Sequence, residues 1–397
     1  MKRLAKIPGK IWRGLVRSKF FHLDHIGVVL VGMVVVSALG LLALNMSIFN
    51  PLQRAFDDFS MTDIYYELQS GEAMELSDDI VLVDMTELQG RGEIGKAIHE
   101  INECKPKVLS VDLIFEKEGE DLVGNAELVE AIEENPNIVF SSKLVDYQPE
   151  KDSFDGLVKS FFSDFGDFKF AYGNVYQKHV GGVIRDYTIS QKYDGKPFYS
   201  LAYQTVCMYT GATPKVQDIN HRMIVYGGTD FLVVKAADIK ESARLLKDKI
   251  VIFGIISGEE DAHFTPVGKM AGMKVQAYSM LSYLKDRHVI QMTKWGSLLL
   301  AFVVCYFSAW VGYWVFRWKK LLAVNILNFY YFFLGAFLVW MAFLCWVHFH
   351  YNVNLLYPLL GIALVEKGRA YYRGLVNLLY TKKKWKILEN SLYVVKE

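Results

Sequence analysis

Three acidic side chains follow the end of one apolar segment, and their type and spacing suit the binding of a cation or another ligand. The segment 248–257, DKIVIFGIIS, is followed after Gly258 by Glu259, Glu260 and Asp261. Hard cations such as Ca²⁺ prefer carboxylate oxygens as ligands. We therefore treat Glu259, Glu260 and Asp261 as a candidate metal site. We expect the neighbouring His263 to be a solvated side chain rather than a metal ligand.

Two other acids end apolar runs of the same design. Asp84 lies in DIVLVDMTE (79–87) and Asp112 in PKVLSVDLIFE (106–116). In open parallel sheets, ligands bind beyond the carboxyl ends of the strands. We expect a binding site there, and the candidate ligand-binding residues are Asp84, Asp112, Arg185 and Asp261. The alternative for each single acid is that it caps the next helix or pairs with a lysine.

The segments around these acids predict a three-layer α/β domain with a largely parallel sheet. Between the first two runs, residues 92–104 place apolar side chains on one helical face, as in an amphipathic crossover helix. Continuous apolar runs suit strands that are buried on both faces. The pattern repeats with a helix near 121–134 and a strand near 137–141.

The composition indicates that part of the chain lies in a membrane, because 52% of its 397 residues are hydrophobic. We predict four α-helical spans, at residues 26–49, 295–316, 321–347 and 351–366. The first is longer than the core of a signal peptide, which is about 7–15 residues, so we expect an uncleaved anchor. Cleavage near Ser37 or Ala43 is the alternative. The last span is short and contains Pro358, but it can still cross if its helix begins near Tyr351, because membrane helices tolerate proline and the bilayer can thin around a short span.

Charge is distributed unevenly along the chain, and this predicts its orientation. Residues 50–291 contain 39 acidic and 25 basic side chains, whereas the rest of the chain contains 4 and 19. Basic clusters flank the spans, and such clusters face the cytoplasm. We therefore expect a multi-pass protein of the inner (cytoplasmic) membrane, with cytoplasmic termini (1–25 and 367–397) and a periplasmic or extracellular domain (50–294). The clusters act as topology signals, so we expect no nucleic-acid partner.

Several stretches of the outer segment resemble the second type of the CHASE extracellular sensory domains, named for their association with cyclases and histidine kinases. These stretches are AFDDFSMTDIYYEL (55–68), the two acid-ended runs above, FYSLAYQTV (198–206) and the long segment 248–284. One span before the domain and three after it is also the usual arrangement of that family. The resemblance covers most of residues 50–290 and implies a sensory role.

Two features depart from that family. Its members commonly carry an Asp-Gly pair ahead of a Val-x-Arg stretch, and here HVGGVIRDY has Gly181 at the position of the acid. Members usually continue into a cyclase or a kinase, whereas about thirty residues follow the last predicted span, far fewer than a domain needs. This basic, amphipathic tail is expected to lie on the inner membrane face or to dock on a partner.

The leading interpretation is a membrane sensor or receptor whose outer domain binds a ligand or a partner and signals to a separate cytoplasmic protein. The alternative is a structural or assembly component of the bacterial cell envelope that binds another protein. We expect no enzymatic activity and no cofactor, because catalytic motifs are missing and Thr86 occupies the place of the second acid of a phosphatase motif. The architecture is compatible with a homodimer. Cys104 and Cys207 either pair or remain buried thiols.

Overall fold

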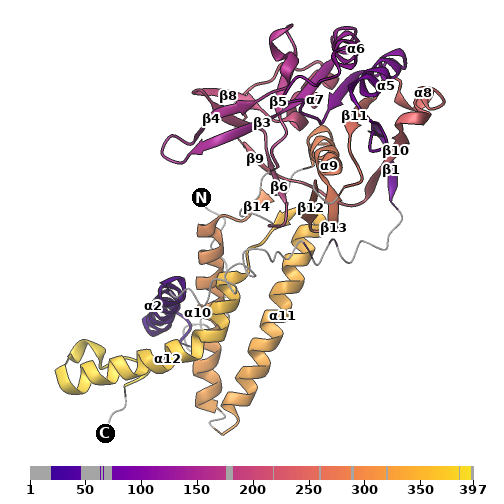
Figure 1. Cartoon of the computed structure of the whole chain (residues 1–397). Helices are drawn as coiled ribbons and strands as arrows, with labels where there is room; N and C mark the ends of the chain where they lie inside the picture. Colours follow the sequence, from indigo (N-terminus) through magenta and orange to yellow (C-terminus); the bar gives the residue numbers. More distant parts are fainter. Residues whose placement is uncertain are drawn as a thin grey trace, which may run out of the picture. The chain divides into compact units, whose positions relative to one another are not determined.

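The computed structural model describes residues 19–45, 63, 66, 74–175, 182–217, 219–258, 261–287, 290–318, 321–383 and 385–394 (Figure 1). The chain divides into two compact units. Met1–Phe59 and Ile290–Glu397 form what we call the helical unit, and Ser60–Val289 form the sheet unit.

The sheet unit is built on one nine-stranded sheet. Its strand order is β10-β1-β11-β2-β3-β4-β7-β8, and β5 also pairs with β3. The strands are β1 (Glu75–Asp84), β2 (Val108–Val111), β3 (Ile138–Gln148), β4 (Ser153–Val158), β5 (Lys169–Tyr172), β7 (Ser190–Tyr193), β8 (Lys196–Tyr199), β10 (Thr229–Lys235) and β11 (Ile250–Gly254). Pairing is parallel from β10 through β3 to β5, and antiparallel between β3 and β4 and between β7 and β8. The predicted mixed α/β domain with a mostly parallel sheet is confirmed.

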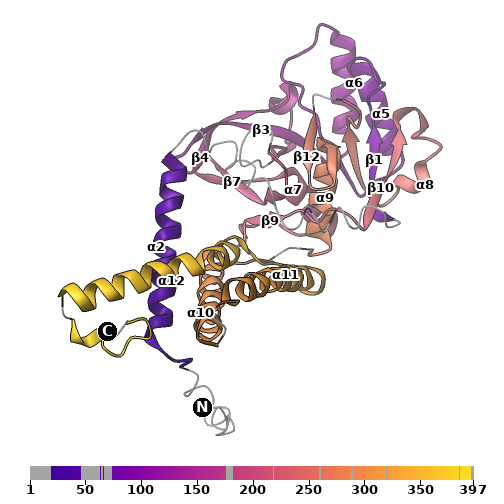
Figure 2. The ribbon, with the colours of Figure 1, turned by 90° about the horizontal axis from the view of Figure 1, so that it is seen from below.

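Helices cover both faces of this sheet (Figures 1 and 2). On one face α5 (Arg91–Glu103) and α6 (Leu122–Glu133) pack on alternate strand residues such as Leu109, Phe140 and Phe253. On the other face lie α7 (Leu201–Thr210) and α9 (Gly272–Leu284), and Thr205 of α7 donates a hydrogen bond to Ser110 of β2 at 3.3 Å. Alternate residues of each strand therefore enter two separate cores, which gives three layers.

Short elements complete the sheet unit. Two further strand pairs are antiparallel: β6 (Asp186–Thr188) pairs with the distant β9 (His221–Met223), and β12 (Ala262–Thr265) forms a hairpin with β13 (Gly268–Ala271). The remaining elements are η2 (Phe161–Asp164), η3 (Ala236–Asp238) and α8 (Ala243–Leu246). The β12–β13 hairpin leads directly into α9, and Asp261 immediately precedes the hairpin.

Asp121 caps the amino end of α6. Its carboxylate accepts a hydrogen bond from the backbone N–H of Gly124 at 3.0 Å. We expect Asp121→Ala to reduce the free energy of unfolding of the sheet unit by about 1 kcal/mol, because a helix N–H loses its acceptor. Urea denaturation followed by circular dichroism measures this. The adjacent exposed Glu120→Ala is the control, and an equal loss in both variants would contradict the capping role.

The two cysteines of the sheet unit do not pair. Cys104 follows α5 on one face of the sheet, Cys207 lies within α7 on the other face, and both are buried free thiols. Burial raises the pKa of both thiols above the ordinary value. The alternative of buried thiols is therefore the one that the structure supports.

The helical unit contains α2 (Leu23–Asn45), α10 (Lys294–Trp318), α11 (Ala323–Phe349), α12 (Leu356–Lys383) and η4 (Lys386–Leu388), together with β14 (Ile290–Gln291) and its parallel partner β15 (Tyr351–Asn352). Within the described part of the chain, only α10 and α11 are long and apolar enough to cross a membrane. The predicted four spans are thus not confirmed. The helix containing the predicted fourth span begins at Leu356 rather than near Tyr351, because Tyr351 pairs in β15, and it continues to Lys383.

Candidate functional site

The carboxyl ends of β1, β11 and β2 bring two of the predicted acids to neighbouring positions. Asp84, the last residue of β1, pairs in register with Gly254, the last residue of β11. The backbone N–H of Asp112 donates to the carbonyl of Phe253 at 2.9 Å, so Asp112 lies on the other side of the same strand end. The parallel order β1-β11-β2 therefore places Asp84 and Asp112 at one edge of the sheet, as the sequence predicted.

Asp112 is held in surroundings that disfavour its charge. Loss of hydration, followed by the negative charge of Asp261, raises the pKa of its carboxyl group from 3.8 to about 6. A hydrogen bond with Ser141 and the nearby His263 oppose this shift. Gly173, which follows β5, crowds this group, because a Cβ there would overlap the Ser141 hydroxyl and lie 3.4 Å from a carboxylate oxygen of Asp112. Asp112, Ser141 and Gly173 thus form the tightly packed floor of the site.

Asp261 lies where the acidic loop meets the amino end of α9. Its carbonyl accepts a hydrogen bond from the N–H of Gly272 at 2.9 Å, and its side chain is 57% exposed. A Cβ at Gly272 would lie 2.6 Å from the carboxylate, so glycine allows this close approach. The positive end of the helix dipole favours a carboxylate at this position.

His263 of β12 pairs with Asp261. Its Nε2 lies 3.4 Å from an Asp261 oxygen, and the side chain is 24% exposed. His263 thus has an acidic neighbour and remains partly exposed to solvent. Asp112, Asp261 and His263 form a set of mutually interacting charges, which we call the strand-end cluster.

Asp84 is occupied by contacts within the loops. Its Oδ1 accepts hydrogen bonds from the backbone N–H groups of Thr86 at 3.0 Å and Ile256 at 3.3 Å, and from the Thr86 hydroxyl. The hydroxyl of Ser257 lies 3.1 Å from that of Thr86. Asp84 therefore ties the loop after β1 to the loop after β11, a structural role that differs from the helix cap or lysine pair offered as the alternative for a single acid.

Arg185 forms an ion pair with Asp63. The two contacts join Nε to Oδ1 at 3.1 Å and a terminal nitrogen to Oδ2 at 2.5 Å. Backbone hydrogen bonds place this stretch beside β12, because the N–H of Ile184 donates to the carbonyl of Phe264 at 2.7 Å. The positive charge of Arg185 is thus neutralised by an acid from the segment that precedes the sheet.

The predicted metal site is only partly described by the structure. Glu259 and Glu260 lie outside the described residues, and Asp261 is the one predicted ligand that can be placed. Among the residues that the structure describes, no three His, Cys, Asp or Glu side chains are grouped so as to hold a metal ion. The strand-end cluster contains two carboxylates and one imidazole, but they are not grouped as the ligands of one metal ion.

Sequence reasoning missed Ser141, Gly173 and Gly272 as parts of the site. Ser141 had a signal, because a serine inside the apolar run of β3 is a polar group on a buried strand. The two glycines had none that distinguished them among the 30 glycines of the chain, because their role depends on acids that lie far away in the sequence.

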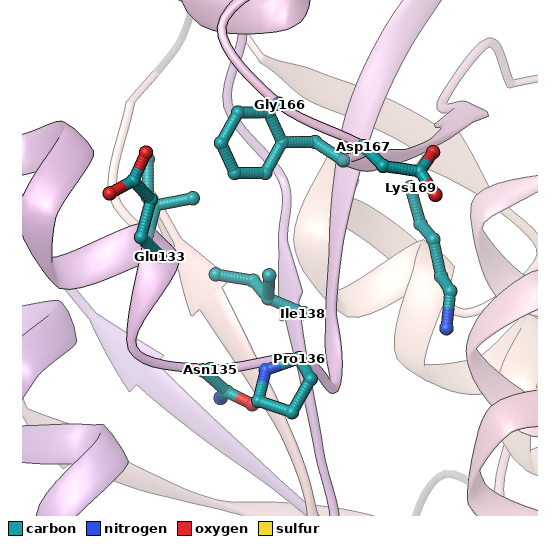
Figure 3. A pocket seen from close by; sticks show the side chains of 9 residues that line it. Glu133, Asn135, Pro136, Ile138, Gly166, Asp167 and Lys169 are labelled. Carbon is teal, nitrogen blue, oxygen red and sulfur yellow. The ribbon is translucent and has the colours of Figure 1, made fainter.

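A separate surface pocket lies at the opposite edge of the sheet (Figure 3). It has a volume of about 220 Å³ and is formed where α6 ends and where β3 and β5 begin. Its lining consists of Ile132, Glu133, Asn135, Pro136, Ile138, Gly166, Asp167, Phe168 and Lys169. The strand-end cluster contributes nothing to this pocket, so the two features are separate.

Of three comparisons with known proteins, one found a match. No curated protein and no solved structure matched the chain. The family model of the CHASE2 domain, an extracytoplasmic sensory domain, matches residues 28–312, which is more than half of the sequence. The sensory resemblance inferred from the sequence motifs is confirmed, and the chain belongs to the CHASE2 domain family.

Proposed function

We propose that this protein is an integral membrane sensor whose sheet unit binds a ligand at the strand-end cluster and signals to a separate cytoplasmic partner. Membership of a sensory domain family supports this role. The observation that carries the proposal is Asp112, a carboxyl group with a pKa raised to about 6 and placed beside a second acid at the strand ends. Perturbed groups of this kind concentrate at functional sites.

The charges of the site favour a ligand that carries positive charge. Asp112 and Asp261 repel each other, and a bound cation or amine relieves this repulsion. The one basic side chain predicted from the sequence at this site, Arg185, is paired with Asp63. We therefore propose a metal ion or a small organic amine as the ligand.

The proposal gives the sheet unit a binding role rather than a catalytic one. If the motif VDMTE (83–87) belonged to a phosphatase, Asp84 would be its nucleophile. In the structure, however, Asp84 accepts hydrogen bonds from Thr86 and Ile256. Thr86 occupies the place of the second acid that such chemistry requires. These contacts favour a structural role in which Asp84 connects the loops that follow β1 and β11.

We also propose that α2 and α12 join α10 and α11 in the membrane, with both termini in the cytoplasm and the sheet unit outside. Charged residues at membrane depth normally face the bundle and bind one another or backbone carbonyls. Arg369 of α12 fits this rule, because it contacts Glu366 at 2.8 Å and donates to the carbonyls of Ser308 and Ala309 in α10. Its charge is therefore compatible with a fourth crossing that extends beyond the predicted end at residue 366.

A ligand transmits a signal only if its affinity differs between two arrangements of the protein. Asp261 of the strand-end cluster is hydrogen-bonded to Gly272 at the amino end of α9, and the chain continues from α9 into α10 after nine residues. Movement of α9 on binding would therefore act directly on the first apolar helix after the domain. This covalent path supports a sensor that signals through its helical unit.

A thermal-shift screen of the sheet unit tests the ligand site. We expect one of the probes, namely Ca²⁺, Mg²⁺ and small amines, to raise Tm in a saturable manner, since a ligand at one hundred times its Kd stabilises by about 2.7 kcal/mol. Asp261→Ala should abolish the shift by removing a carboxylate of the site. Asp155→Ala, an exposed acid of β4, is the matched control and should retain it.

The absence of a shift with every probe would contradict the ligand site. That result would favour the alternative function, an envelope component that binds another protein through its sheet unit. Crosslinking of the full-length protein in its native membrane would then identify that partner.

A further inference from the structure

A buried carboxylate at the start of α2 holds the far end of the chain. Asp24 is 4% exposed, and its two oxygens accept hydrogen bonds from the Tyr372 hydroxyl at 2.8 Å, the Ser391 hydroxyl at 2.9 Å and the backbone N–H of Leu392 at 2.5 Å. A buried charge is tolerated only when it is hydrogen-bonded in this way. Asp24 therefore joins α2, α12 and residues 385–394, which we call the tail segment.

The aromatic side chain of Tyr393 anchors the tail segment among the helices. It is buried and packs edge-on against Tyr372 and Tyr313, with ring centroids 5.8 Å and 6.5 Å away. Val28 of α2 and Val365 of α12 belong to the same apolar cluster. The tail segment is thus packed into the helical unit and not only attached at its surface.

The helices α2 and α12 cross (Figure 2), and glycines allow them to approach closely at the crossing. A Cβ at Gly27 would overlap the ring of Tyr372, the residue that also binds Asp24. A Cβ at Gly368 would lie 2.9 Å from the Cα of Gly32. A small displacement of α2 against α12 therefore changes the position of Tyr372 and of the acceptor that holds the tail segment.

We propose that the tail segment is a latch that is closed by Asp24 and Tyr372 and released when α2 shifts against α12. In the closed state, Tyr393 is buried in the helical unit and Ser391 and Leu392 are partly buried, so this stretch is not free to bind another protein. In the released state, this short apolar and aromatic segment becomes available to a cytoplasmic partner. The role of the latch in signal output rests on the proposed sensor function, whereas the latch contact itself does not.

Hydrogen exchange of the full-length protein in lipid nanodiscs, read by mass spectrometry, tests the latch without any ligand. Peptides that cover residues 385–394 should be protected in the unmodified protein. Tyr372→Phe removes one hydrogen bond to Asp24 and should speed exchange of the tail segment by about tenfold. Tyr371→Phe removes the same atom from a neighbouring side chain that is 58% exposed and should leave exchange unchanged.

A second pair of variants tests the coupling to α2. Gly27→Ala forces Tyr372 aside and should also speed exchange of the tail segment by about tenfold. Gly32→Ala makes the same change on the same helix, but its Cβ would lie at an ordinary 3.9 Å from Gly368. We expect this control to match the unmodified protein.

The proposal is overturned if the tail segment is unprotected in the unmodified protein, or if Tyr372→Phe and Gly27→Ala exchange like their controls. If Gly27→Ala also speeds hydrogen exchange in α10, the helical unit as a whole has lost structure. The result for the smaller change, Tyr372→Phe, then determines whether the latch proposal holds. A negative ligand screen on the sheet unit leaves these results unaffected, so failure of the sensor function and failure of the latch are distinguishable.

Discussion

Asp112→Asn is expected to make the sheet unit more stable at pH 8 and less sensitive to pH. The pKa of Asp112 is raised from 3.8 to about 6 in the folded state, so its contribution to stability is complete below pH 3.8 and is lost as the pH rises through 6. At pH 8 the folded protein contains an ionised group in surroundings that disfavour it. Because Asp112 is only half-buried, we expect a gain of about 1–2 kcal/mol from the neutral amide.

Urea denaturation of both forms at pH 5 and pH 8, followed by circular dichroism, measures this effect. The difference in the free energy of unfolding between Asp112→Asn and the unmodified protein should be larger at pH 8. Asp155→Asn, at an exposed position of β4, should give no such difference. A destabilised Asp112→Asn variant at pH 8 would show that the ionised carboxylate is favoured, contrary to our account of the site.

Phe162→Ala is expected to cause the largest loss of stability among the changes considered. Phe162 is fully buried, and its ring contacts those of Phe115, Phe140, Phe168 and Phe170 at centroid distances of 4.9 to 6.3 Å. Removing it leaves a cavity between η2 and the sheet, which should reduce the free energy of unfolding by about 3–5 kcal/mol.

Phe165→Ala is the matched control for this change. Phe165 follows η2 directly but is 58% exposed, so the same truncation should alter stability by less than about 1 kcal/mol. Urea denaturation of the sheet unit measures both variants. Similar losses in the two would mean that the cluster around Phe162 does not contribute as its packing indicates.

The elements of the sheet unit were predictable in segments whose apolar residues recur with a clear helical or strand spacing. The helix expected at 92–104 is observed at Arg91–Glu103, because its apolar residues recur at helical spacing and face the sheet. In the run 106–116 the strand ends at Val111, so Asp112 lies at the strand end, as expected from the acid-rich turn that follows. β3 extends to Gln148, beyond the predicted 141, because its polar second half pairs with β4, and only the tertiary structure shows that pairing.

The site was predictable only in part. Asp112 and Asp261 could be placed at one edge because parallel strands share their carboxyl ends. The pairing of Arg185 with Asp63 joins residues 122 positions apart, and nothing in either local sequence indicates it. The same holds for the contact between Asp24 and Leu392, which are 368 positions apart. Long-range polar contacts depend on how the elements assemble, and sequence periodicity does not report that.

The most direct test of the sensor function is hydrogen exchange of the full-length protein with and without the cation or amine that gives the largest thermal shift. We expect slower exchange around the strand-end cluster, in residues 261–265 and 272–276, together with altered exchange in α10 or the tail segment. Slower exchange confined to the sheet unit would mean that the ligand binds without signalling. No change at the strand-end cluster would contradict the proposed ligand site itself.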